Sequence, residues 1–220
     1  MNFADLKELL AVGVGRTDLE ASYPRWINRA LKQIQKDHDW SWAKSILSVV
    51  VDAGTTIEAL PSTFKCLSSE RTPIYITAGL GETTPRPCYV VSYEHTQNLK
   101  GAAWPASAGT GSSTGTYVYL QRATIGVVSL RVPDAPSSNV TFSVSAYSFL
   151  PALSADDDEN ILTTDYEDLV EAKLKSIAFA TVNDPLAADY ENLYRLRLQE
   201  AIRDDYARTH KGRAVRMGGD

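Results

Sequence analysis

The chain has 220 residues, of which 44% are hydrophobic and 22% are charged, and its formal net charge is −5. This composition is ordinary for a folded protein and fits one large domain or a helical body with one inserted lobe. An acidic chain argues against a dedicated nucleic-acid binder, which needs a clustered basic face. No apolar run approaches the roughly 18 residues that cross a bilayer, and the first residues lack the basic start of a secretory signal. We therefore expect no membrane partner.

Apolar residues at helical spacing predict two helices near the N-terminus. The first covers residues 3–12 and ends at a pair of glycines. The second covers residues 23–44, and Thr17 with Glu20 before it has the spacing of a capping box. The apolar stripe of this second helix comprises Trp26, Ile27, Ala30, Leu31 and Ile34, opposite Arg29, Lys32, Gln33 and Lys36.

The middle of the chain changes to strand patterns. Tyr117 and Tyr119 alternate with Val118 and Leu120, which is the period of a strand with two different faces. Strands at this spacing without helices between them favour an antiparallel sandwich or small barrel and disfavour a parallel α/β fold. Runs of β-branched and aromatic residues between turn signals predict strands over residues 46–51, 56–60, 74–77, 89–93, 116–121, 127–132 and 140–149.

Small residues dominate positions 101–116, where only Trp104-Pro105 interrupts a run of glycine, alanine, serine and threonine. Such a stretch offers little apolar surface to offset its ordering entropy, which favours a long flexible loop or hairpin tip. A functional loop is the alternative, because an exposed Trp104 is suited to anchor a partner.

Helical periodicity returns from about Thr163, is interrupted at Asp184-Pro185, and continues from Leu186 to Tyr206. Residues after His210 lack it and are expected to form a loose tail. Neither helical part is long enough to bury a core of its own, so we expect the two ends of the chain to pack together.

The expected fold class is therefore α+β, a helical bundle built from both chain ends with an inserted antiparallel β-sandwich or small barrel. The expected limits are residues 1–44 and 151–208 for the helical body, 45–150 for the β domain and 209–220 for a flexible basic tail.

Motifs for catalysis or cofactor binding are not evident in the sequence. The three histidines, His38, His95 and His210, lie in different segments without metal-ligand spacing. Glu94 beside His95 has acid–base chemistry in principle, but nothing supplies a nucleophile or an orienting partner. We expect no catalytic, metal-binding or cofactor-binding residue, and a hydrolase with an unrecognised site is the least favoured interpretation.

Acidic residues and cysteines leave two smaller questions. The run Asp156-Asp157-Asp158-Glu159 lacks the spaced ligands of an EF-hand, so a solvated linker that places negative charge before a helix is favoured over a calcium site. Cys66 and Cys88 lack CxxC spacing and are expected to be buried or half-buried thiols in a reducing compartment. Sequence does not decide whether they pair.

Basic residues cluster at the C-terminus, where few acids follow Asp205. A basic tail on an acidic body is suited to dock onto an acidic surface of another protein. The residues expected to do so are Arg208, Lys211, Arg213 and Arg216.

Two groups of short motifs occur in a fixed order. The N-terminal signature is Trp26-Ile27-Asn28-Arg29-Ala30 followed by Asp39-Trp40. The C-terminal signature is Leu150-Pro151-Ala152-Leu153, Asp158-Glu159-Asn160 and Tyr166-Glu167-Asp168-Leu169, after which a helix has a tyrosine-rich start from Tyr190 to Tyr194. In these motifs the chain resembles the tailed-bacteriophage head–tail adaptor (connector) proteins that form the ring beneath the portal.

The resemblance implies a structural virion protein at the head–tail junction, made in the host cytoplasm. It implies a ring, commonly of twelve copies, that bridges the portal protein and a tail nozzle or tube protein. Double-stranded DNA would pass through the lumen of this ring without sequence recognition. No catalytic residue and no cofactor carry over, and the basic tail would order on contact with the portal.

A rival interpretation is a β-sandwich module of a phage tail that binds carbohydrate or a surface. In that interpretation Trp104, Tyr117 and Tyr119 form a platform of aromatic rings. In the adaptor interpretation the same three residues are candidate partner-facing aromatics.

Overall fold

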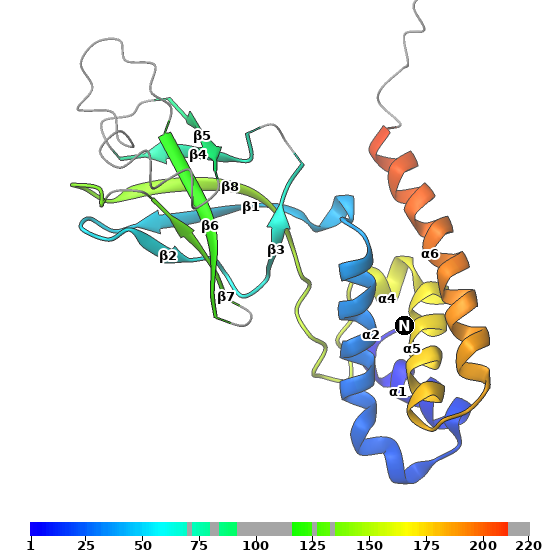
Figure 1. Ribbon diagram of the computed structural model, residues 1–220. Helices are drawn as coiled ribbons and strands as arrows, with labels where there is room; N and C mark the ends of the chain where they lie inside the picture. Colours follow the sequence, from blue (N-terminus) through cyan, green and yellow to red (C-terminus); the bar gives the residue numbers. More distant parts are fainter. Residues whose placement is uncertain (70–71, 80–83, 92–115, 125–126, 133–134, 211–220) are drawn as a thin grey trace, which may run out of the picture. The chain divides into compact units, whose positions relative to one another are not determined.

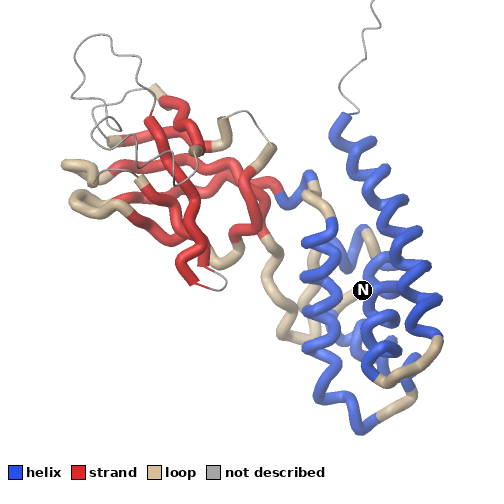
Figure 2. Tube along the Cα trace, in the orientation of Figure 1, coloured by secondary structure: helices blue, strands red, loops and turns tan. Residues whose placement is uncertain are grey.

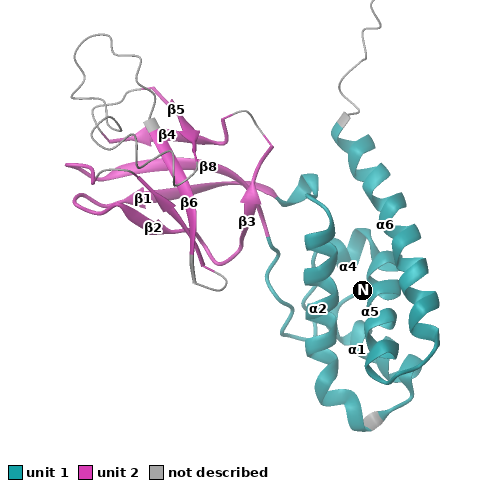
Figure 3. Cartoon of the chain, viewed as in Figure 1, with its two compact units in different colours: residues 1–43, 149–220 teal, residues 44–148 magenta. Residues whose placement is uncertain are grey.

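The computed structural model describes residues 1–69, 72–79, 84–91, 116–124, 127–132 and 135–210. The fold is α+β, with five α-helices and eight strands in the described part of the chain. The chain divides into two compact units (Figures 1 and 3): unit 1 is residues 1–43 with 149–220, and unit 2 is residues 44–148. The helices belong to unit 1 and the strands to unit 2 (Figure 2). Over the described ranges, a search for a helix with the length and apolarity of a membrane span finds none.

Unit 1 is organised around α5, which packs against α1, α2 and α6. Its α-helices are α1 (Phe3–Val14), α2 (Tyr23–Asp37), α4 (Ile161–Asp165), α5 (Glu167–Thr181) and α6 (Leu186–His210), with short 3₁₀ helices η1 (Thr17–Ser22) and η2 (Ser41–Ala43). Residues from both parts of the chain share one core, to which the apolar stripes of α1, α2 and α5 contribute. The most buried members are Leu6, Leu10, Ile27, Ala30, Ile34, Leu162, Val170, Leu174 and Ala178.

Helices α1 and α4 of unit 1 start with asparagine caps. The side chains of Asn2 and Asp5 form a capping box at α1, and those of Asn160 and Thr163 form another at α4. The segment in which a capping box was expected at Thr17 and Glu20 is itself the 3₁₀ helix η1, and α2 follows with Ser22 as its N-cap and no side-chain cap hydrogen bond.

The predicted helix over residues 23–44 is too long. Helix α2 ends at Asp37 because His38 takes an extended conformation, with φ −148° and ψ 150°. The indole Nε1 of Trp40 then donates to the carbonyl oxygen of Ile34 (3.1 Å), so the chain folds back over the end of the helix. The helical spacing of apolar residues continues through this turn, and for that reason the sequence pattern predicted a longer helix.

The C-terminal helices also differ from the prediction at their limits. One helix was expected from Thr163, but the structure has two, α4 and α5. They are separated at Tyr166, where φ is −131° and ψ is 39°. Helix α6 continues through His210, so Arg208 lies in a helix rather than in a tail.

Unit 2 is one sheet with strand order β1-β8-β4-β5-β6-β7-β2, and β3 also pairs with β8. Strands β1 and β2 at the two ends of this order contact each other, so the sheet is barrel-like and nearly closed. The strands are β1 (Lys44–Val51), β2 (Ile57–Ala59), β3 (Phe64–Leu67), β4 (Ile74–Ala78), β5 (Arg86–Val90), β6 (Thr116–Thr124), β7 (Val127–Arg131) and β8 (Val140–Ser148).

One strand pair corrects the expectation of a purely antiparallel lobe. Strands β5 and β6 run parallel, with Cys88 opposite Thr116 and Tyr89 opposite Tyr117. A parallel pair needs a long connection, and most of residues 91–115 between these strands lies outside the described residues. The strand β3 was not predicted.

The core of unit 2 lies along β8, where buried and half-buried positions alternate. Gly79 packs so closely against the backbone of Asn139 and Val140 that a Cβ there would clash, and its φ of +98° also requires glycine. The fully buried residues of this core include Val51, Ile74, Ile76, Val118, Leu130, Val140, Phe142, Val144 and Ala146.

Candidate functional site

Asn28 joins the two sequence signatures. Its Nδ2 donates to the carbonyl oxygen of Leu153 (2.9 Å), and its Oδ1 accepts a hydrogen bond from the backbone N–H of Leu153 (2.9 Å). The amide thus satisfies both backbone groups of a residue that lies in the C-terminal signature. Gln35 repeats the pattern, because its Oε1 accepts from the N–H of Leu150 (2.6 Å). The backbone of the segment that follows unit 2 is therefore bound to α2 by two side chains.

Aromatic rings make a second contact between the signatures. Trp40 is 1% exposed and its ring centroid lies 5.1 Å from that of Tyr166, while Trp42 stacks on Trp40 at 5.9 Å. Burial raises the pKa of Tyr166, and nearby carboxylates add to this while Arg208 opposes it. The signature residues are therefore contacts that close the helical unit rather than a reactive site.

Asp205 is a buried carboxylate that the sequence analysis did not single out. It is 4% exposed and accepts hydrogen bonds from the N–H (3.0 Å) and Oγ (2.5 Å) of Ser41, and its Oδ2 lies 3.2 Å from His38 Nε2. These bonds attach the segment after α2 to α6. In the sequence, only its spacing along α6 could have indicated this burial, because Asp205 continues the buried side of the helix that includes Tyr194 and Ala201.

The acidic run is a folded turn. The carboxylate of Asp158 accepts from the N–H groups of Ser154 (2.6 Å) and Ala155 (2.8 Å), which lowers the pKa of Asp158. Backbone carbonyls of the same run accept the first N–H groups of α1, from Phe3 to Asp158 (2.9 Å) and from Ala4 to Asp156 (3.0 Å). No group of three or more metal-binding side chains occurs in the described ranges.

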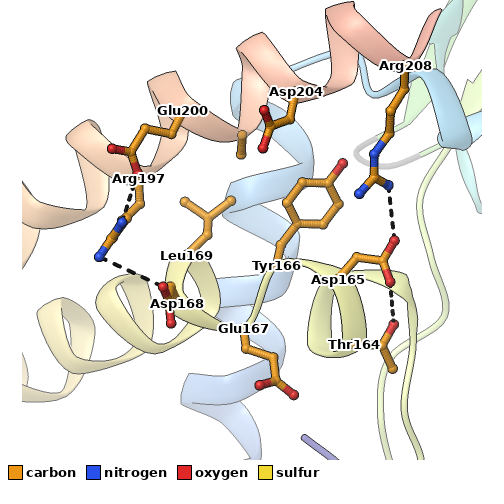
Figure 4. Close-up of a pocket in the computed structure, with 11 residues that line it drawn as sticks. Thr164, Asp165, Tyr166, Glu167, Asp168, Leu169, Arg197, Glu200, Asp204 and Arg208 are labelled. Carbon is orange, nitrogen blue, oxygen red and sulfur yellow. Dashed lines mark hydrogen bonds and ion pairs between the residues drawn. The ribbon is translucent and has the colours of Figure 1, made fainter.

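A shallow groove lies between α6 and the junction of α4 with α5 (Figure 4). Its volume is about 380 Å³. Five carboxylates and two guanidinium groups line it, so negative charge is in excess. We call this surface the acidic groove; its charged members are Asp165, Glu167, Asp168, Glu200, Asp204, Arg197 and Arg208.

Both arginines of the acidic groove are paired. Arg208 donates to Asp165 (3.1 Å) and lies over the ring of Tyr166 at 5.7 Å. Arg197 donates to Glu200 (2.9 Å), and its guanidinium lies 3.8 Å from Asp168 (Figure 4). Hydrogen bonds to Asp165 and Glu200 raise the pKa of Arg208 and Arg197 respectively. The structure thus uses Arg208 within unit 1.

Four of the six other predicted site residues lie outside the described residues, namely Trp104, Lys211, Arg213 and Arg216, and so does His95. Tyr117 is half-buried and packs against Tyr89, with centroids 5.8 Å apart. Tyr119 is 6% exposed, so its ring is not presented to a partner by this unit. Of the three aromatics, the structure therefore describes only Tyr117 and Tyr119, and neither is fully exposed.

The cysteines do not form a disulfide. Cys88 is 1% exposed, and burial raises the pKa of its thiol to about 12. Cys66 is half-buried in β3. Cys88 therefore lacks the lowered pKa that a nucleophilic cysteine needs.

Comparison with protein families explains the signatures. Residues 1–217 match the model of the SU10 adaptor protein family, a family of phage head–tail adaptors. No curated protein sequence matches the chain. The family match covers both units, confirms the resemblance drawn from the two signatures, and implies a structural role in the virion at the head–tail junction. The chain belongs to the SU10 adaptor protein family.

Proposed function

We propose that this chain is a ring-forming adaptor that joins the portal to the tail and continues the channel for DNA. The observation that carries the proposal is the match to an adaptor family over residues 1–217, which includes the helical unit, the β unit and most of the basic C-terminus. Its partners would be the portal protein, a tail nozzle or tube protein and further copies of itself, twelve in the usual ring.

A closed ring needs subunits whose shape is well defined, because a fixed rotation must bring the last copy back to the first. The bonds from Asn28 and Gln35 to the segment 150–153, together with those of Asp205, support such a body in unit 1. They hold distant parts of the chain in one helical unit, and we assign that unit to ring contacts.

The basic C-terminus is assigned to the portal. We assign Arg208 to unit 1 instead of to the docking segment, since its guanidinium donates to Asp165. The proposed docking segment therefore begins after His210 and contains Lys211, Arg213 and Arg216. A short charged segment at the end of a helix is suited to order on an acidic portal surface.

DNA would pass through the ring without sequence recognition. The net charge of −5 suits this role, because tight binding to phosphates would oppose ejection of the genome.

Removal of residues 211–220 tests the assignment of the C-terminus. The truncated chain is expected to keep both units folded, measured by circular dichroism, and to lose binding to portal rings in co-sedimentation. Full-length Arg16→Ala, which removes an exposed arginine paired with Asp18, is the matched control and is expected to bind portals as the unaltered chain does. Normal loading of the truncated chain onto portals would show that docking does not depend on this segment.

A further inference from the structure

Four basic side chains form a line on the exposed side of α2. Arg25, Arg29, Lys32 and Lys36 are separated by four, three and four positions, which places them on one side of a helix. All four are exposed, and the line is about 16 Å long at the rise of an α-helix. We call it the basic row.

The basic row differs from the rest of unit 1 in its pairing. Among the described residues none of its four members forms an ion pair, and Lys32 only lies over the ring of Phe149 at 5.6 Å. The lysines and arginines elsewhere in the described part of this unit are paired, apart from Arg203. The paired ones are Lys7, Arg16, Lys173, Lys175, Arg195, Arg197 and Arg208. In a chain with excess acid, a run of four unpaired cations points to a partner from another molecule.

A complementary surface exists on the same unit. The acidic groove has more carboxylates than guanidinium groups, and its outer members Asp168 and Asp204 are exposed. On α6 the groove adjoins two exposed leucines, Leu193 (39% exposed) and Leu196 (54% exposed). Helices α2 and α6 both pack against α5 and border unit 1 on its two sides in the view of Figure 1. The basic row and the acidic groove are therefore different surfaces of one subunit.

We infer that the basic row of one copy docks onto the acidic groove and the adjoining leucines of the next copy. The inference rests on the proposed ring. Because the two surfaces differ, the contact is head-to-tail and repeats from copy to copy, which is the type of interface that closes into a ring. Opposite charges set the register of such a contact, and the exposed leucines supply apolar area.

Double-stranded DNA is the other class of molecule that a row of cations attracts. A second copy is favoured over DNA by the other charged surface of unit 1. The same unit carries a matching acidic surface, and the exposed Leu193 and Leu196 that adjoin it suit a contact with protein. Contacts of this kind weaken as salt screens the charges, so ring formation is expected to decline with ionic strength.

Charge reversal tests the contact. The row variant carries Arg29→Glu and Lys36→Glu, and the groove variant carries Asp168→Lys and Asp204→Lys. Each variant alone is expected to lower the assembled fraction on portal rings at least tenfold, measured by mass photometry at fixed concentration. An equal mixture of the two variants is expected to restore assembly, because the two acids introduced in the row then face the two bases introduced in the groove. Arg195→Glu, a reversal at an exposed and paired position, is the control and is expected to assemble normally.

Several results would overturn the inference. Unchanged assembly of the row variant would do so, as would a mixture that fails to restore rings although both variants are folded. Loss of binding to double-stranded DNA with rings intact would assign the row to DNA instead. In each of these cases the unaltered chain still forms rings on portals, so the proposed function stands. An unaltered chain that never assembles on portals would contradict the ring and this contact together.

Discussion

The two units of this chain are closed by different means. Unit 1 depends on individual side chains that bind distant backbone, such as Asn28 to Leu153 and Asp205 to Ser41. Unit 2 depends on backbone ladders around β8, which pairs along its length with β1 and on its other side with β4 and β3. In a ladder the hydrogen bonds come from the main chain, so many different side chains are compatible with the same strand pairing. The adaptor signatures accordingly lie in unit 1, where single side chains make the contacts that close the unit.

Substitutions in the two cores are expected to separate the stabilities of the two units most strongly. Trp40→Ala removes a fully buried indole that contacts Trp42 and Tyr166 and donates to Ile34. We expect unit 1 to lose about 3–5 kcal/mol of unfolding free energy, while the protection of unit 2 against hydrogen exchange is unchanged. Phe142→Ala is the matched change in unit 2 and is expected to give the reverse pattern. Equal losses in both units from either variant would show that the units do not unfold separately.

Asn28 and Asn139 allow a direct comparison of two clamps. Asn28→Ala leaves the N–H and carbonyl of Leu153 without partners, at a cost of about 2–4 kcal/mol. Asn139 makes a similar pair of bonds in unit 2, to the N–H of Ala53 and to Asp52, but in an exposed turn. Asn139→Ala is therefore expected to cost about 1 kcal/mol or less. Chemical denaturation followed for each unit measures both values, and equal costs would refute the assignment of Asn28 as the stronger clamp.

Asp205 tests a single charged clamp. Asp205→Asn keeps one acceptor oxygen but removes the charge that faces the N–H and hydroxyl of Ser41, so a loss of about 2 kcal/mol is expected. Hydrogen exchange at residues 38–43 is expected to rise more than exchange in α5. The adjacent exposed change Asp204→Asn serves as the control. Faster exchange in α5 than at Ser41 would mean that Asp205 stabilises the bundle as a whole.

The buried thiol of Cys88 is expected to make the stability of unit 2 depend on pH. This effect is smaller than those above. Its pKa in the folded chain is raised from 9.0 to about 12 by burial. The unfolded chain therefore releases the proton first as pH rises, so the stability contributed by the neutral thiol is complete below pH 9 and declines toward pH 12. Between pH 8 and pH 10 unit 2 is expected to lose about 1 kcal/mol, and Cys88→Ala is expected to remove that loss. Cys66→Ala, in the half-buried cysteine, should keep it; identical pH slopes in all three chains would contradict the prediction.

Local patterns predicted much of the secondary structure. Apolar periodicity located α1, α2, α5 and α6, and β-branched runs located seven of the strands. They failed where tertiary contacts decide the outcome. Trp40 and Trp42 continue the helical spacing of α2, but their rings pack on a turn instead. The strand β3 has only four residues and no β-branched residue, so its pattern is too short to read.

The candidate site was predictable in its parts and not in its arrangement. The signatures were visible as motifs, yet the bond between Asn28 and Leu153 joins residues 125 positions apart. The basic side of α2 was visible as residues opposite an apolar stripe. Its lack of ion pairs within the described chain depends on where every acid lies in space, which no local pattern contains. The burial of Tyr119, which removes it from a surface platform, depends equally on strand pairing.

Electron microscopy of the chain mixed with portal rings of its own phage tests the central claim most directly. The account predicts one ring of identical copies attached beneath the portal, with an open channel on the portal axis. A chain that remains unassembled on intact portals, or attaches without forming a ring, would contradict it.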